Sequence, residues 1–493
     1  MSGAYLIAWL LPIGAGTLCA LALCRRGAAG RVAQALGYGV VLGMLLVAML
    51  ASWTARADTA HAWSRAGAWL VLVAIVSGAL MWYRSRRRGA NVAASTVASA
   101  SGKVELWKRG ALVLALASLA WRGWLMASEL LQRPTYPWDA WVAWAVKSKT
   151  WFLLGHYAPF VPIEAWLRDG AAELYSGPAW AYPATLAWLQ VWFASAAGDW
   201  IEPLVNLPWL ALWIGLLLGH YGQWRALGLD RTRAAVAVYL LGSLPLLGSH
   251  VALAGYADLW VATLFGFATL AWLRWQEQRD RDQLILALVC AAAMPLLKLE
   301  GIVWCVGVVA AIGFGALSTR WRWRAAAIVA TLLFVIVLVG QSNMLFAAIG
   351  WIRSGSRAID IPVIGKLSVA WHGDAAIGVV RSLFLQSNWH LLWWLVGPVI
   401  VWRWRALRAS DSMSVCALLL LGCFALLLFL FVFTDAAEWA ESYTAVNRLV
   451  MHITPAVVSL LALLLRGPPL FPRTSSPGSS DTARSRAAPP GPA

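Results

Sequence analysis

The chain has 493 residues, of which 61% are hydrophobic and only 12% are charged, about half the charged fraction of an average soluble domain. This composition excludes a water-soluble globular protein, a disordered chain and a disulfide scaffold. The cysteines all stand inside apolar runs, which favours small buried hydrophobic residues over a disulfide or zinc framework. The sequence therefore predicts an all-α polytopic membrane protein.

Runs of roughly 17–25 apolar residues are long enough to cross the bilayer core as α-helices. The sequence predicts about thirteen of them, followed by a Pro-, Ser- and Gly-rich segment, 466–493, that we expect to be a disordered cytoplasmic tail. The expected helices cover residues 4–24, 33–53, 66–83, 110–130, 204–221, 234–254, 256–275, 283–299, 301–317, 325–344, 388–403, 414–433 and 446–465.

The net charge of +17 arises from 39 Lys and Arg against 22 Asp and Glu. If the N-terminus is outside, the inner loops carry 26 of these 39 cations, as the positive-inside rule requires. The charge is then explained by topology and by contact with membrane lipids, and nucleic acid is excluded as a partner. Two long segments, 131–203 and 345–387, fall on the outer side.

The first outer segment contains Trp141, Trp144, Ser148 and Trp151 at helical spacing. This pattern predicts an amphipathic helix in the headgroup plane, with its aromatic face toward lipid and Lys147 toward water.

A second apolar helix begins at Tyr182-Pro183 and continues to about Ala197. If it spanned the membrane, every later basic loop would face outward, against the positive-inside rule. We therefore predict a second juxtamembrane helix here.

Asp139 follows the fourth predicted membrane helix and is flanked by Trp138 and Trp141. A carboxylate at the membrane surface is well placed to take a proton from an incoming hydroxyl group. Asp139 is also suited to cap the helix that follows it. Both interpretations stay open, and one residue can serve both.

These features resemble the GT-C superfamily of membrane glycosyltransferases, which includes protein O-mannosyltransferases and bacterial lipid A aminoarabinose transferases. The resemblance covers roughly 110–465 and leaves 1–109 as an N-terminal three-helix extension. It is carried by short motifs: Trp138-Asp139-Ala140-Trp141, Tyr182-Pro183, Gly255-Tyr256-Ala257-Asp258, Lys298-Leu299-Glu300-Gly301 and Asn447-Arg448 with His452 and Pro455.

The resemblance implies a polyprenyl-phosphate sugar donor and a lipid, glycan or protein acceptor at the outer face of the bacterial inner membrane. It makes Asp139 the base and assigns basic residues to the lipid phosphate. Relatives often carry an acidic residue just before Tyr-Pro, whereas this chain has Ala179-Trp180-Ala181. The second acid is therefore missing there or is supplied by Glu173 or Asp169, so a divalent metal is not supported by the sequence and no cofactor is assigned.

The remaining candidates each have a functional and a structural interpretation. Asp258 is the second catalytic candidate, as a group that orients a substrate, or it caps a helix. Lys298 and Glu300 contact phosphate or sugar, or they pair with each other. Arg448 binds a phosphate or anchors its helix at the interface. His452 contacts substrate or is a buried core histidine.

Four aromatic and basic residues of the first outer segment complete the predicted substrate site: Trp138, Trp141, Lys147 and Tyr182. Sugar rings stack on indole faces, although an interfacial tryptophan belt explains the same residues.

Two other function classes remain open. A lipid-linked glycan flippase or transporter would show charges deep in the bundle, broken helices and pseudo-symmetry. Arg122, inside the fourth predicted helix, needs a partner there in any case. A surface-glycan polymerase or ligase would share the lipid-linked donor and would use a large late outer loop.

Overall fold

The computed structural model describes residues 3–88, 106–169, 173–318, 320–322, 324, 358–361, 365–368 and 370–466. In these residues seven helices are long and apolar enough to cross a membrane, or eight if one bent pair counts as a span. The described strands form two small sheets, β1 (Phe160–Val161) parallel to β2 (Tyr175–Ser176) and β3 (Ala358–Ile361) antiparallel to β4 (Gly365–Ser368). The helical, multi-pass membrane fold is confirmed, whereas a count of thirteen spans is not.

The long apolar helices match predicted runs closely. They are α1 (Gly3–Leu23), α2 (Arg31–Thr54), α3 (Ala62–Arg88), α4 (Leu106–Gln132), α10 (Pro208–Ala226), α21 (Asp411–Phe433) and α23 (Val446–Leu464). The predicted helix 256–275 is α13 (Asp258–Gln278), which is of similar length but is not one of these seven. Shorter apolar helices are α15 (Gly301–Ala316) and α19 (Leu392–Trp402), with α20 (Trp404–Ala409) after them. The predicted helix 325–344 and the tail from residue 467 lie outside the described residues.

The predicted helix 234–254 is two helices, α11 (Arg231–Gly242) and α12 (Pro245–Ala252), that meet at 60°. Pro245 has no N–H, and its ring blocks the preceding turn, so the helix must stop there. Similarly, the predicted helix 283–299 is α14 (Arg281–Ala293) followed by the 3-10 turn η2 (Met294–Leu296).

Arg122 of α4 finds its partners at the break between α11 and α12. Its Nη2 donates to the carbonyl oxygens of Leu244 at 3.0 Å and Pro245 at 3.4 Å. Backbone carbonyls freed by a helix break need such a donor in a bilayer. A Cβ on Gly248 would stand 2.3 Å from this guanidinium, so a larger residue would displace the Arg122 side chain from the break.

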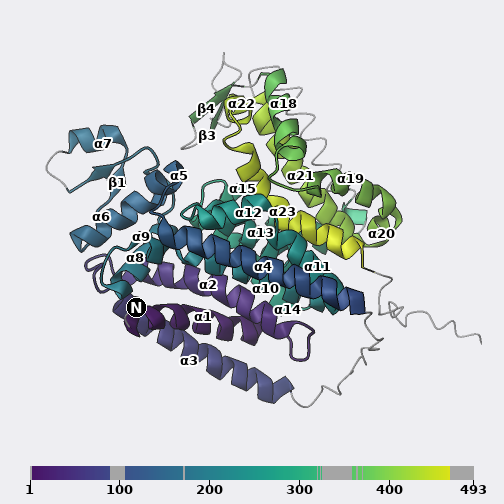
Figure 1. Cartoon of the computed structure of the whole chain (residues 1–493), viewed down its shortest axis with the longest axis horizontal. Helices are drawn as coiled ribbons and strands as arrows, with labels where there is room; N and C mark the ends of the chain where they lie inside the picture. The colour runs from purple at the N-terminus through teal and green to yellow at the C-terminus, as the bar shows by residue number, and fades with distance from the viewer. Residues whose placement is uncertain are drawn as a thin grey trace, which may run out of the picture.

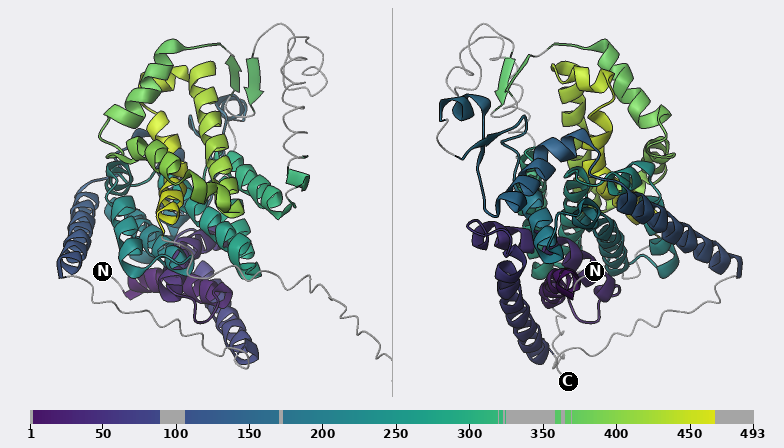
Figure 2. Two further views of the ribbon diagram at one scale, coloured as in Figure 1. Left: turned by 90° about the vertical axis from the view of Figure 1, so that its right-hand side faces the viewer. Right: turned by 60° about the vertical axis from the view of Figure 1, so that its left-hand side comes forward.

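The helices differ in the share of their surface that is buried by the rest of the protein. The apolar stretches of α2 and α23 are mostly buried, whereas α3 and α4 expose most of their apolar side chains. Figure 2 shows α3 and α4 projecting at the edge of the bundle. Their exposed apolar faces are those expected to contact lipid.

The first outer segment lies beside the end of the bundle at which α1 begins (Figure 1). Its elements are α5 (Trp138–Ala140), the π-turn η1 (Trp141–Ala145), α6 (Val146–Leu154), α7 (Ile163–Arg168), α8 (Thr185–Ala197) and α9 (Glu202–Asn206). The elements α18 (Gly373–Val380), η3 (Arg381–Leu385) and α22 (Ala437–Glu441) gather near the start of α23, with α18 packed on α22.

The N-terminal helices are joined to the rest of the bundle by a glycine seam. A Cβ on Gly37 of α2 would lie 2.2 Å from the backbone nitrogen of Gly219 in α10. Small residues of this kind let two membrane helices approach to backbone contact.

A buried network of polar side chains also connects α2 to α10, α13 and α14. Arg274 Nη1 donates to Gln34 Oε1 at 2.8 Å, and Gln34 Nε2 donates to Gln283 Oε1 at 3.1 Å. Gln223 Nε2 donates to the same Gln283 oxygen and to the Tyr38 hydroxyl. Helices α1 and α2 are therefore an integral part of the packed bundle.

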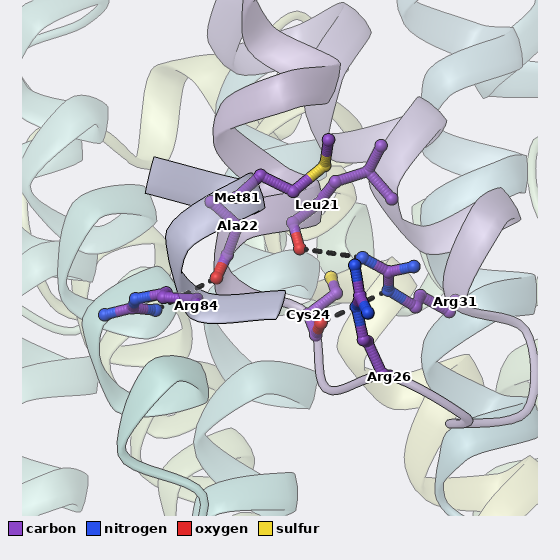
Figure 3. A pocket seen from close by; sticks show the side chains of 7 residues that line it. All are labelled: Leu21, Ala22, Cys24, Arg26, Arg31, Met81 and Arg84. Atoms are coloured by element: carbon purple, nitrogen blue, oxygen red, sulfur yellow. Dashed lines mark hydrogen bonds between the residues drawn. The ribbon is translucent and has the colours of Figure 1, made fainter. Parts of the chain in front are cut away.

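Two arginines donate hydrogen bonds to backbone carbonyls at the C-terminal end of α1 (Figure 3). Arg31 donates to the carbonyl oxygens of Cys24 and Leu21, at 3.2 and 3.1 Å. Arg84 Nη1 donates to the Ala22 carbonyl and to Asp282 Oδ1. These guanidinium groups satisfy carbonyls that a helix end leaves without partners.

Contacts also join several of the basic loops that we predict on the inner side. Arg466 pairs with Glu277 at 3.1 Å and donates to the Leu227 carbonyl, while Arg403 donates to the Leu464 carbonyl. These loops therefore lie at one common end of the bundle, as a single membrane face requires.

We expect Gly37→Val to lower the free energy of unfolding in detergent by about 1–3 kcal/mol or more, because α2 must move away from α10. Gly14→Val in α1 is the matched control, since no atom lies within 4 Å of its added Cβ. Equal unfolding curves for the two variants would show that the seam carries no stability.

Candidate functional site

Six of the predicted site residues form one connected network, which we call the Asp258 cluster: Asp139, Asp258, Lys298, Glu300, Arg448 and His452. They come from the beginnings of α5, α13, α15 and α23 or from residues just before them. The cluster therefore lies where several membrane helices start, at the end of the bundle opposite to the basic loops.

Asp258 is the centre of the cluster and is fully buried. Its Oδ1 accepts from Lys298 Nζ at 2.8 Å and from His452 Nε2 at 3.0 Å. Its Oδ2 accepts from Arg448 Nη2 at 3.0 Å. Both oxygens are thus occupied, and no side chain caps α13. This environment suits a residue that positions Arg448 and Lys298, whereas direct substrate contact by Asp258 stays a prediction.

Asp139 is the exposed acid of the cluster. Arg448 Nη1 donates to Asp139 Oδ2, and 45% of the Asp139 side chain is exposed. The N-cap residue of α5 is Pro137, with no side-chain cap. The capping interpretation of Asp139 is therefore wrong: its carboxylate faces Arg448 instead of the helix N-terminus.

Arg448 bridges the buried and the exposed carboxylate. It also lies over the ring of Tyr256, with its Cζ 4.5 Å from the ring centroid. The two carboxylates and the aromatic face hold the planar guanidinium in one orientation.

His452 is neutral, as its two ring contacts show. Trp304 Nε1 lies 2.9 Å from His452 Nδ1, and an indole N–H can only donate. Nδ1 must therefore carry the lone pair, so the proton on Nε2 is donated to Asp258. The ring is completely buried, as the core-histidine interpretation expects.

Lys298 and Glu300 pair with each other at 3.1 Å, as their structural interpretation expects. Lys298 is buried, and Glu300 Oε2 is buried with no hydrogen-bond partner among the described residues. With Asp139, Asp258 and Arg448 included, the cluster holds three carboxylates against two cations. An anion can therefore bind in the cluster only if one carboxylate is protonated or releases the cation with which it is paired.

Lys147 does not face water, and this part of the helix prediction is wrong. The side chain is buried, and its Nζ donates to the carbonyl oxygens of Ala179, Trp180 and Tyr182 at 2.9–3.0 Å. Burial lowers the pKa of Lys147 to about 8. Three acceptors match the three ammonium protons, so Lys147 fixes the segment that carries Tyr182.

The tryptophan stripe also packs against protein, because α8 lies beside it. Trp144 and Trp151 are buried, Trp144 Nε1 donates to the Pro183 carbonyl, and Trp151 packs on Trp188. At 13 residues α8 is too short to span a membrane, in agreement with its predicted juxtamembrane character.

Three predicted substrate contacts lie on the accessible side of this segment. Trp138 is 71% exposed, Trp141 is half-buried beneath Lys149, and Tyr182 is half-buried against Trp144. Burial raises the pKa of Tyr182 to about 12, so its hydroxyl stays protonated at neutral pH. These residues remain predicted substrate contacts.

A cavity of about 270 Å³ is lined by Arg448 together with residues of α12, of the segment around Gln386 and of the start of α23. Sequence reasoning missed it, together with Tyr256, Trp304 and Asn447 as structural neighbours of the site. Asn447 adjoins Arg448 in the sequence and Tyr256 lies two residues before Asp258, and this closeness was the available signal.

Between pH 8 and pH 10.5 we expect the stability of the wild type, relative to Lys147→Met, to rise by ~3 kcal/mol. In this window the unfolded lysine binds a proton that the folded one has lost, so deprotonation favours the folded state. Detergent unfolding at a series of pH values measures the difference. A stability difference between wild type and Lys147→Met that does not change with pH would show that the three carbonyls keep the folded ammonium protonated throughout.

In the part of the chain that the structure describes, no group of three or more His, Cys, Asp or Glu side chains is placed to hold a metal ion. Comparison with known proteins identifies no relative: no protein-family model, no curated protein and no solved structure matches the chain.

Proposed function

We propose that the protein is a membrane glycosyltransferase. It would move a sugar from a polyprenyl-phosphate donor to a hydroxyl group of a lipid, glycan or protein acceptor, at the outer face of the bacterial inner membrane. The observation that carries the proposal is the Asp139–Arg448–Asp258 arrangement, in which one arginine joins an exposed carboxylate to a buried one at the ends of membrane helices.

Asp139 serves as the base. Of the three carboxylates in the Asp258 cluster it has the most exposed side chain, so it is the one that an acceptor hydroxyl can approach. It takes the hydroxyl proton while the acceptor oxygen forms a bond to the anomeric carbon. The bond from that carbon to the phosphate oxygen breaks, its electron pair leaves with the phosphate, and the anomeric centre inverts.

Arg448 receives the leaving phosphate. As Asp139 takes up the proton it loses its charge, and its hold on Arg448 weakens. The guanidinium nitrogen that faced Asp139 is then free to donate to the phosphate, so the cluster gains no net charge during transfer. Asp258, Lys298 and His452 keep Arg448 in place, and a group held in advance needs no reorganisation during the reaction.

Transfer of label from radiolabelled short-chain polyprenyl-phosphate sugars, with crude membrane acceptors and the protein in vesicles, tests the proposal. We expect transfer from at least one donor of the panel. Glu164→Gln, an exposed position of α7 in the same outer segment, should transfer at the wild-type rate. Absence of transfer from every sugar donor would contradict the proposal.

A lipid flippase is the second candidate, because α11 and α12 form a broken pair with Arg122 donating into the break. Discontinuous helices with an internal charge are a feature of transporters. Movement of a fluorescent polyprenyl phosphate across vesicles, without transfer of any label, would favour this function.

A further inference from the structure

We propose that the cavity beside Arg448 holds the sugar of the donor and that this sugar carries no positive charge. This inference rests on the proposed function and names the class of sugar on which it acts. It is carried by the unpartnered hydrogen-bonding groups of the cavity and by the absence of a carboxylate from its lining.

The position of the cavity fits a group attached to a phosphate. Arg448 lines it, and so does Tyr256, the residue whose ring supports the Arg448 guanidinium. A phosphate bound at Arg448 would therefore present its ester-linked group to the cavity, with Asp139 on the same guanidinium.

Several hydrogen-bonding groups in the lining have no protein partner. Asn388 and Asn447 both donate to Gln386 Oε1, at 3.1 and 2.7 Å. This arrangement leaves the Gln386 amide nitrogen and the Asn388 amide oxygen without a partner among the described residues. Hydroxyl groups, which both donate and accept, are the chemical match for such a pair.

His250 supplies the second observation. The side chain is 5% exposed, and its Nδ1 lies 3.0 Å from the Leu246 carbonyl oxygen, which can only accept. In the neutral ring Nε2 is then an acceptor, and it is buried without a partner in the described structure. A buried polar atom of this kind is costly to leave empty, and a ligand hydroxyl would satisfy it.

The charges of the lining residues also favour a neutral sugar over a positively charged one. Of the eleven residues that line the cavity, Arg448 carries the permanent charge and none carries a carboxylate. A protonated amino sugar would find no carboxylate in the lining to accept from its ammonium group, whereas a neutral sugar meets amides and hydroxyls. The volume of about 270 Å³ is near the lower limit for small-molecule sites, about 300 Å³, so one monosaccharide fits better than an oligosaccharide.

Binding to the full-length protein in nanodiscs tests this inference with three probes: a short-chain polyprenyl phosphate, the same lipid carrying glucose, and the same lipid carrying an amino sugar. We expect the glucose lipid to bind at least about tenfold more tightly than the bare lipid, the value of two or three neutral hydrogen bonds. The amino-sugar lipid should bind no more tightly than the bare lipid.

Ser249→Trp places a large ring at the exposed edge of the cavity and should abolish the preference for the glucose lipid. Its affinity for the bare lipid should stay within about twofold of wild type, because the substitution leaves Arg448 and its partners Asp139 and Asp258 unchanged. Leu240→Trp, at an exposed position of α11, is the matched control and should keep the preference. Asn388→Asp, which adds a carboxylate, should shift the preference toward the amino-sugar lipid.

Equal wild-type affinity for the bare and the glucose lipid would overturn the cavity as the sugar site and leave the proposed function standing. Tighter binding of the amino-sugar lipid would overturn the charge class. Failure of all three lipids to bind would overturn the proposed function together with this inference.

Discussion

Asp139→Asn is expected to reduce the rate of sugar transfer by roughly 10²–10⁴-fold, the range by which general-base catalysis accelerates reactions. Asparagine has nearly the same shape, and its amide oxygen can still accept from Arg448. It cannot take up the acceptor proton. Single-turnover transfer in vesicles measures the effect, and donor affinity, measured separately, should not fall, because loss of the Asp139 charge leaves Arg448 freer to bind the phosphate.

Asp199→Asn is the control for this substitution, because Asp199 is an exposed acid of the same outer segment whose side chain contacts its own neighbour Trp200. It should leave the rate unchanged. A rate for Asp139→Asn within about threefold of wild type would exclude Asp139 as the base. The next candidate would then be Glu300, whose Oε2 has no partner among the described residues.

Asp258→Asn is expected to destabilise the protein by about 3–5 kcal/mol, because it leaves buried cations without their shared counter-charge. Lys298 would retain Glu300, and Arg448 would retain the partly exposed Asp139. Unfolding in detergent, followed by tryptophan fluorescence, measures the loss.

The double variant Asp258→Asn/Lys298→Met separates the charge effect from a change in packing. Removing both charges of the pair should recover at least about 1 kcal/mol of the loss from the single substitution. Losses that simply add would show that Asp258 and Lys298 are not coupled through charge.

The apolar runs predicted most helices of the bundle to within a few residues, because a membrane helix needs a long uninterrupted stretch of this kind. They failed at Pro245 and Pro295, where the stretch stays apolar while the helix breaks. A hydropathy average over a long window hides a single proline, whereas the missing N–H and the ring of that proline interrupt the helix.

The candidate site was predicted residue by residue but not as a network. Asp139 and Arg448 are 309 residues apart, and Asp258 and Arg448 are 190 apart. Each stood out as a charge at the end of a predicted membrane helix. Helical periodicity correctly placed Trp144 and Trp151 on one face, yet it could not show that α8 covers that face in place of lipid.

The polar network on α2 has a consequence for the biosynthesis of the protein. Gln34 bonds with Gln283, which the ribosome adds 249 residues later. At about 5–20 residues per second, this delay lasts roughly 10–50 s. For most of that time the Gln34 amide and the Tyr38 hydroxyl lack these partners, since Gln223 of α10 follows Tyr38 by 185 residues and Arg274 of α13 follows Gln34 by 240. The polar contacts of α2, which enters the membrane early, are therefore among the last to form. Until the chain is more than half made, the polar groups of α2 must be kept away from the lipid core.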